Sequence, residues 1–237
     1  MTINFKFPIS NLRRMHDISK LHIFTDFDGT ITDTDSLVFL TKELGGGVDY
    51  LNSIGAQLRA GTMSLRDGIT HEMFSIRAPF SAAVELLRTR IKVDPAFFTF
   101  AHWCKSNNFP LTVLSAGFYE IIELFIAPAE FPDLEILANH IRPDSAGWHC
   151  EFRDDSDYGH DKARVIQQKQ AQGCHTIFIG DGISDRSAAE VADEVFATHY
   201  LAQYCREREI KHHEFATFAD ILNHLQISTR KHEIITS

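Results

Sequence analysis

The feature that most constrains the fold is a short apolar run that ends in two aspartates and a glycine. Residues 21–25 read LHIFT, and Asp26-Phe-Asp28-Gly29-Thr30 follows directly. Aspartate is depleted in strands and glycine weakens them, so the run predicts a buried strand that breaks into a turn at its carboxyl end. Two carboxylates there suit a hard cation or an attack on phosphorus. Alone, the pattern is weak, because turns also collect aspartate and glycine.

Two further apolar runs, at 111–114 and 174–179, also end in polar or glycine residues, and a helical stretch opens with a lysine between them. In an open α/β sheet, ligands bind beyond the carboxyl ends of the strands. We therefore expect the residues at these ends to converge on one site. They comprise Ser115, Ala116, Gly117, Lys162, Asp181 and Asp185.

Gly180-Asp181-Gly182 invites a different interpretation, because a glycine pair between a strand and a helix also occurs in dinucleotide-binding sites. The third glycine of that fingerprint is replaced here by Asp185. Asp181 would also place a negative charge where the pyrophosphate lies. We therefore favour a metal-dependent phosphoryl site over a nucleotide site.

The ordered set DFDGT, LSAG, an isolated DK and GDGISD resembles the four motifs of the haloacid dehalogenase-like phosphatase superfamily. Strands that alternate with helices independently predict a parallel sheet covered on both faces. Residues 36–93 hold only helix-like segments. The resemblance, to the phosphoserine phosphatase-like members, therefore implies a doubly wound, Rossmann-like α/β core (1–35 and 94–237) with an inserted α-helical cap (36–93).

The resemblance also implies a role for each motif residue. Asp26 would be the nucleophile that forms an aspartyl-phosphate, and Asp28 the general acid and base. Ser115 would donate to the phosphoryl oxygens, and Lys162 would neutralise their charge. Thr30 would support the turn and hold Asp28. The residues expected to contact the substrate are Gly29, Thr30, Ala116, Gly117, Asp35 and Phe74.

The cofactor implied by the resemblance is Mg²⁺. The Asp26 carboxylate, the backbone carbonyl of Asp28 and the Asp181 carboxylate would hold it. Asp185 would act behind them or through a water molecule.

For the substrate, the chain is similar to the methionine-salvage 2-hydroxy-3-keto-5-methylthiopentenyl-1-phosphate phosphatase family over 26–35, 63–76, 197–205 and 213–221. The run 63–76 contains Met73 and Phe74, which would suit a thioether tail, although either could simply pack inside the cap. We favour this enol-phosphate as the substrate.

Phosphoserine phosphatase activity is the alternative. In that family a serine follows the second aspartate and a cap arginine binds the substrate carboxylate. Here Gly29 replaces the serine and Thr70 stands at the arginine position, while Arg66 and Arg77 flank it. A non-catalytic phosphate-binding module is less favoured, because all the motif aspartates are present. A phosphotransferase is a further, less favoured option, which would need a cap that excludes water better than it excludes sugar.

Bulk composition excludes several classes of protein. The 237 residues carry a formal net charge of −9 and no Lys/Arg block, which disfavours nucleic-acid binding. The apolar runs fall short of the roughly 20 residues that span a membrane, and the N-terminus lacks the apolar core of a signal peptide. We expect a cytoplasmic monomer or homodimer that acts on a small phosphorylated metabolite.

Cysteine and histidine patterns add little. The four cysteines show no C-x-x-C pair, so we expect free thiols. The 13 histidines include no H-E-x-x-H motif, and we assign no zinc site from the sequence. His160 stands out because it lies two residues before Lys162.

Overall fold

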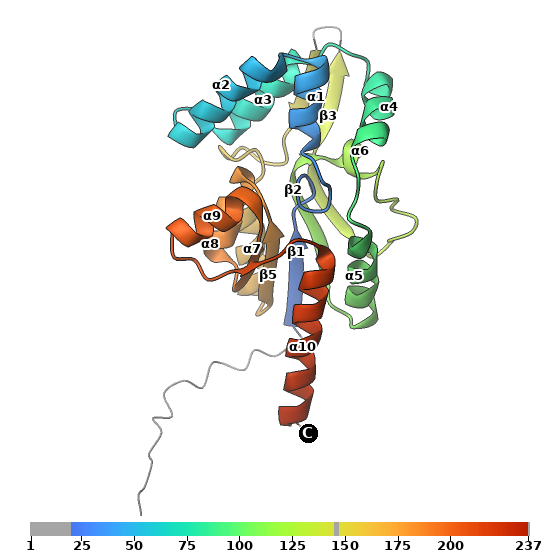
Figure 1. Ribbon diagram of the computed structural model, residues 1–237, viewed down its shortest axis with the longest axis vertical. Coiled ribbons are helices and arrows are strands. Elements are labelled where there is room, and N and C mark those ends of the chain that lie inside the picture. The colour runs from blue at the N-terminus through green and yellow to red at the C-terminus, as the bar shows by residue number, and fades with distance from the viewer. Residues whose placement is uncertain (1–19, 145–146, 237) are drawn as a thin grey trace, which may run out of the picture.

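The computed structural model describes residues 20–144 and 147–236, within which seven strands form one sheet (Figure 1). The order is β4-β3-β2-β1-β5-β6-β7. Neighbouring strands are parallel except β3 and β4, which are antiparallel. The strands are β1 (Leu21–Thr25), β2 (Leu111–Phe118), β3 (Glu135–Asp144), β4 (Gly147–Glu151), β5 (His175–Gly180), β6 (Glu194–Ala197) and β7 (His213–Glu214).

The helices fall into an N-terminal block and a set that alternates with the strands. The block contains α1 (Ser36–Leu44), α2 (Gly47–Ala60), α3 (Leu65–Ser75) and α4 (Phe80–Arg90). The others are α5 (Pro95–Ser106), α6 (Tyr119–Ile122), α7 (Lys162–Ala171), α8 (Arg186–Val191), α9 (His199–Glu207) and α10 (Phe218–Thr236), with a 3₁₀ turn, η2, at Ile183–Asp185.

The buried strands contribute side chains to two hydrophobic cores, one on each face of the sheet. Successive side chains of a strand point to opposite faces. Ile23 packs in the core that contains Phe97 of α5 and Phe218 of α10, whereas Phe24 packs in the core that contains Ile166 of α7. Helices therefore cover both faces, which confirms the predicted doubly wound α/β class.

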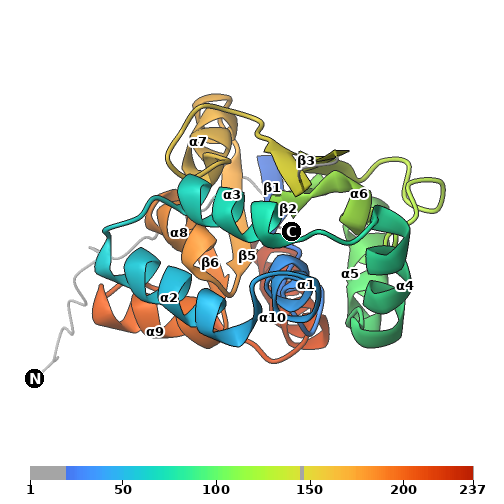
Figure 2. The same cartoon turned by 90° about the horizontal axis from the view of Figure 1, so that it is seen from above.

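Helices α2 and α3 extend across the carboxyl ends of the central strands when the molecule is seen from above, whereas α4 lies to the side, over α5 (Figure 2). Ser64 caps α3 by accepting a hydrogen bond from the backbone N–H of Asp67, as its spacing predicts. Ser81, which follows Pro79-Phe80, is also predicted from the sequence to cap a helix, and this is wrong. α4 begins one residue earlier, and Pro79 occupies its N-cap position.

Helix α3 is joined at both ends to the β3–β4 hairpin and the loop that follows it. At its start, Arg66 donates from Nη1 to the Asp154 carbonyl and from its backbone N–H to the Asp157 carbonyl, at 2.6 and 2.9 Å. Just beyond its end, the Trp148 indole N–H donates to the Ala78 carbonyl at 2.9 Å. Helix α2 instead packs against α1 and α3.

Several element boundaries differ from the sequence expectation. The sequence also predicts a helix at about 118–126 and a strand around 135–139. The helix is the single turn Tyr119–Ile122, and the strand continues to Asp144, where it pairs with β4. The edge strand β7 was not predicted. The expected lead-in, 1 to about 20, lies outside the described residues except for Lys20. Within the described ranges, no helix has both the length and the apolar character to cross a bilayer.

Candidate active site

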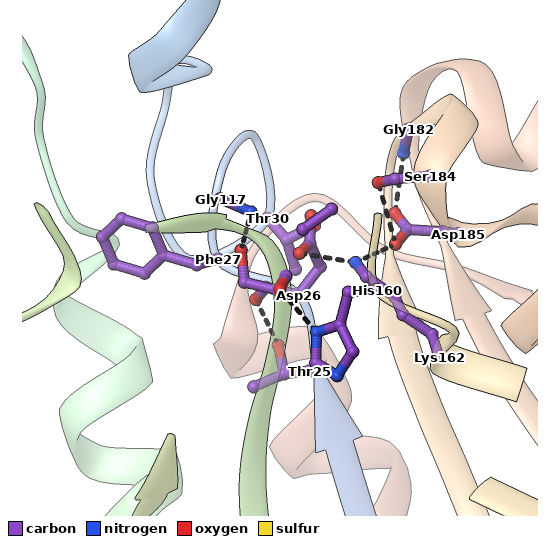
Figure 3. A network of polar contacts seen from close by, with 12 residues as sticks. Thr25, Asp26, Phe27, Thr30, Gly117, His160, Lys162, Gly182, Ser184 and Asp185 are labelled. Carbon is purple, nitrogen blue, oxygen red and sulfur yellow. Dashed lines mark hydrogen bonds and ion pairs between the residues drawn. The ribbon is translucent and has the colours of Figure 1, made fainter. Parts of the chain in front are cut away.

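The predicted motif residues meet at the carboxyl ends of β1, β2 and β5 beneath the helical block. A cavity of about 360 Å³ opens there. Its floor contains Asp26, Asp28, Ser115, Ala116, Gly117 and Asp181. Lys162 and Asp185, which are fully buried, extend the same polar network behind Asp26 (Figure 3).

Lys162 joins two of the aspartates. Its ammonium nitrogen donates to Asp26 Oδ1 and Asp185 Oδ1, both at 2.7 Å. Burial alone would lower the pKa of Lys162, but the Asp185 and Asp26 carboxylates raise it well above its usual value. Asp161 caps the first turn of α7 and so fixes the backbone that carries this lysine.

Asp28 lies in the turn after β1, where its Oδ1 accepts a hydrogen bond from the backbone N–H of Ser36 at 2.8 Å. Its Oδ2 approaches Gly117 so closely that a Cβ there would lie 2.4 Å away and would displace the Asp28 carboxyl. Burial raises the pKa of Asp28 well above its usual value, and Asp35 adds to this. Such a carboxyl suits proton donation.

Thr30 does not hold Asp28 as expected. Its hydroxyl donates to Asp181 Oδ1 at 2.9 Å, because the turn directs it across to the end of β5. Gly29 permits this turn with a φ of +76°, and a Cβ on it would lie 2.4 Å from Asp181 Oδ2. Burial, with Asp185 and Asp26 nearby, raises the pKa of Asp181 to about 9.

The carboxylates form a group suited to a divalent cation. Oxygens of Asp26, Asp181 and Asp185 lie within 4.8 Å of one another. The Asp185 Oδ2 accepts hydrogen bonds from the backbone N–H groups of Asp181 and Gly182, each at 2.9 Å. Burial raises the pKa of Asp26 despite the opposing Lys162 ammonium. Carboxylate oxygens are the donors that Mg²⁺ prefers.

Ser115 lies near the end of β2, and His160 contacts its backbone carbonyl. The Ser115 hydroxyl oxygen accepts a hydrogen bond from the Gly117 N–H at 2.9 Å, which leaves its own hydrogen free for a ligand. His160 Nδ1 lies 2.8 Å from the Ser115 carbonyl, an acceptor, so this nitrogen carries the proton (Figure 3). Burial lowers the pKa of His160 to about 4. His160 therefore positions Ser115 as a neutral side chain.

Asn139 is a supporting residue that the sequence did not reveal. Its buried amide donates to the Ala116 carbonyl at 2.8 Å and accepts from the Arg153 N–H at 3.0 Å. It therefore links the end of β2 to the segment after β4. A single asparagine within an apolar strand gives no signal unless the paired strands are known.

The roof of the cavity comes from the helical block. Apolar residues predominate there, namely Leu37, Val38, Leu51, Leu58, Leu65 and Ile69. The polar residues are Asp35, Asn52, Arg59 and Glu72. Asp35 was predicted; the other three were not, because their pattern is that of ordinary helix residues.

Glu72 is the unusual member of the roof. Its side chain is buried, with 8% of its surface exposed, and among the described residues no group donates a hydrogen bond to its carboxyl. Burial, with Asp35 nearby, raises its pKa to about 8, so Glu72 is protonated at neutral pH.

Three cap residues singled out in the sequence lie outside the lining of this cavity. The Phe74 ring lies beneath the Arg77 guanidinium, at 4.4 Å, and beside His149. Arg66 packs over the Phe152 ring at 4.1 Å. The structure therefore does not bring Phe74 to this cavity, and the arginine that lines the cavity is Arg59 rather than Arg66 or Arg77.

Comparison with known families agrees with this geometry. Residues 23–190, well over half of the chain, match the model of the haloacid dehalogenase-like hydrolase family. The chain belongs to this family. A substrate-bound phosphoserine phosphatase structure shares the family fold, with a TM-score of 0.69 at 16% identity, covering 86% of this chain and 98% of that one.

Curated relatives cover nearly the whole chain. Pdp3-interacting factor 1 of Schizosaccharomyces pombe is 35% identical, covering 87% of this chain and 95% of its own. The polyol phosphate phosphatase PYP1 of Saccharomyces cerevisiae is 33% identical (86% and 91%). The 2-hydroxy-3-keto-5-methylthiopentenyl-1-phosphate phosphatase of Brevibacillus brevis is 27% identical (87% and 96%). The chain is thus a phosphatase of the haloacid dehalogenase family, whose relatives act on different substrates.

Proposed function

We propose that this phosphatase hydrolyses phosphate monoesters of small metabolites through an aspartyl-phosphate on Asp26, with Mg²⁺ at the carboxylate group. One observation carries the proposal. Asp26 lies on the cavity floor with Lys162 2.7 Å behind it, and Asp28 lines the same floor with its carboxyl hydrogen-bonded by Ser36. A nucleophile, backed by a fixed positive charge, and a proton donor therefore face one space.

In the first step, an Asp26 carboxylate oxygen bonds to phosphorus as the bond from phosphorus to the leaving oxygen breaks. Asp28 gives its proton to that oxygen, for which its raised pKa prepares it. In the second step, Asp28 takes a proton from a water molecule that attacks phosphorus. The bond to Asp26 then breaks, inorganic phosphate leaves and the carboxylate is restored.

The surrounding residues stabilise charge on the transferred group. Asp26, the Asp28 backbone carbonyl and Asp181 would hold Mg²⁺, with Asp185 behind them. When bound, Mg²⁺ supplies positive charge to the phosphoryl oxygens. Lys162 provides a second fixed charge in a site shielded from water. The Ser115 hydroxyl, already oriented by Gly117, donates its hydrogen to a phosphoryl oxygen.

We propose that 36–93 acts as the cap and 1–35 with 94–237 as the core. The cap residues form the roof of the cavity, opposite the carboxylates of the core. Their role is to exclude water during phosphoryl transfer and to contact the leaving group.

Two substrates, which differ in their leaving groups, are supported. The methylthio enol-phosphate has the support of the 27% identical relatives and of the apolar roof, although Met73 is buried in the core and Phe74 lies outside the cavity. A polyol phosphate has the support of the name of the 33% identical yeast relative and of Glu72 and Asn52, which can bind hydroxyl groups. We favour the polyol phosphate.

The test is phosphate release with Mg²⁺ from a sugar-alcohol phosphate, the enzymatically generated enol-phosphate and phosphoserine, with Asp26→Asn as the blank. Activity should be absent in Asp26→Asn. The wild type should lose activity in chelator and regain it when Mg²⁺ is added. Full activity in chelator would refute the metal assignment. The substrate with the highest kcat/KM identifies the preferred leaving group.

A further inference from the structure

Three side chains meet at the far edge of the sheet, away from the phosphatase site. Glu194 opens β6, His213 opens β7 and His224 lies on α10. The parallel strands place Glu194 at the amino end of β6, whereas the phosphatase site lies at the carboxyl ends of its neighbours. The three residues are half-buried, and their ligand atoms all lie within 4.8 Å of one another.

The distances fit a tetrahedral metal site. His213 Nε2 lies 3.0 Å and His224 Nε2 lies 3.5 Å from the same oxygen, Glu194 Oε1. Zinc bonds of about 2.0–2.1 Å at tetrahedral angles separate neighbouring ligand atoms by about 3.3 Å. The two measured separations fall on either side of this value.

The donor types select the metal. Two imidazoles and one carboxylate are a zinc set, whereas Mg²⁺ prefers oxygen atoms alone. The rings of His213 and His224 lie 4.1 Å apart at their centroids, where two imidazolium ions would repel each other. Both Nε2 atoms face one carboxylate oxygen, as the ligands of a shared cation would.

We propose that Glu194, His213 and His224 bind one Zn²⁺ ion, which joins the edge strand β7 and helix α10 to β6. Strand β7 is only two residues long and pairs with β6 through two residues. A metal ion held by three separate elements would strengthen this weak edge, and zinc would raise the melting temperature by mass action. The site is independent of the phosphatase activity.

The test measures the amount of zinc bound per chain in the untagged full-length protein. The protein is exposed to Zn²⁺ in the presence of excess Mg²⁺ and then dialysed. The Mg²⁺ is there to occupy the carboxylates of Asp26, Asp181 and Asp185. We expect one zinc per chain in the wild type and close to none in His213→Ala or His224→Ala. His212→Ala is the matched control and should keep its zinc, because His212 contacts the Ile210 carbonyl and Glu214 instead.

Zinc should also raise the melting temperature of the wild type and of His212→Ala, but not that of His224→Ala. Unchanged Mg²⁺-dependent phosphate release would show that His224→Ala is folded. Co²⁺ in place of zinc should give the visible absorption of a four-coordinate ion. Equal zinc content in all four proteins, or loss of zinc from the wild type on dialysis, would overturn the proposal, because each outcome leaves the two histidines as simple hydrogen-bond donors to Glu194.

Discussion

Each carboxylate on the cavity floor has a different partner, and that partner determines its chemistry. Asp26 contacts an ammonium group, Asp28 a backbone N–H and Asp181 a hydroxyl, at 2.7, 2.8 and 2.9 Å. The first is suited to attack, the second to proton transfer and the third to holding a metal ion. Thus Thr30 matters through Asp181, which it orients.

Replacing Thr30 with valine should weaken Mg²⁺ binding without removing any ligand. Loss of an outer hydrogen bond to a ligating carboxylate lowers metal affinity about 10- to 100-fold. The Mg²⁺ concentration for half-maximal phosphate release should rise by that factor, with kcat at saturating Mg²⁺ close to wild type. Thr30→Ser keeps the hydroxyl and should behave as wild type. A lower kcat with unchanged Mg²⁺ dependence would contradict this role.

Most of the floor could be predicted from the sequence, because its residues follow strands and motifs in order. The hydrogen-bond partners of these residues could not be predicted. The contact of Thr30 with Asp181 spans 151 residues, and that of Asn139 with Ala116 depends on how β2 and β3 pair. Glu72 gave no signal, because a glutamate on a helix is usually exposed.

At the level of elements, helix α3 brings a protonated carboxyl into the roof of the cavity. Glu72 is buried and faces the same space as Asp35. A neutral acid can both donate to and accept from a hydroxyl group. Arg59 lines the same roof and would face an anionic group, such as the carboxylate of phosphoserine.

Glu72→Leu should lower kcat/KM for a sugar-alcohol phosphate by about tenfold, the value of one hydrogen bond. An aryl phosphate lacks the hydroxyl groups, so its kcat/KM should change little. Glu72→Gln, which keeps a donor and an acceptor, should lose less than Glu72→Leu. Equal losses on both substrates would mean that Glu72 supports only the packing of α3.

The element boundaries show where sequence patterns lose information. Short apolar stretches predict that β2 and β3 exist, but their ends depend on pairing with β4 and on the hydrogen bonds of Asn139. Strand β7 is two residues long, too short for any periodicity. The helical block was predicted because four helix-like segments occur in succession.

At the scale of the whole molecule, the sheet buries His22 in its neutral form. Its Nε2 lies 2.9 Å from Thr112 Oγ1, whose own hydrogen goes to Glu135, so His22 is the donor. Burial, with the Lys169 charge nearby, lowers the pKa of His22 from 6.5 to about 4. The unfolded chain therefore binds a proton that the folded chain rejects as the pH falls from 6.5 towards 4.

The His22 contribution to stability is complete above pH 6.5 and is lost as the pH falls towards 4. Between pH 7 and 5, the unfolding free energy of the wild type should fall by about 2 kcal/mol more than that of His22→Gln. Denaturant titrations at both pH values measure this difference. His71→Gln, a change at an exposed histidine, should follow the wild type. Parallel pH profiles for wild type and His22→Gln would contradict the assignment.

The attachment of α3 at both ends determines the side from which the site opens. Lifting α3 breaks the hydrogen bonds of Arg66 and Trp148, each worth about 1 kcal/mol. The turn between α2 and α3 faces a second cavity, of about 330 Å³, lined by Met63, Arg186 and Tyr204 among others. The hydrogen bonds that α2 makes through Tyr50 and Gln57 stay within the helical block. We therefore expect α2 to move more readily than α3, with substrate entering and phosphate leaving past α2.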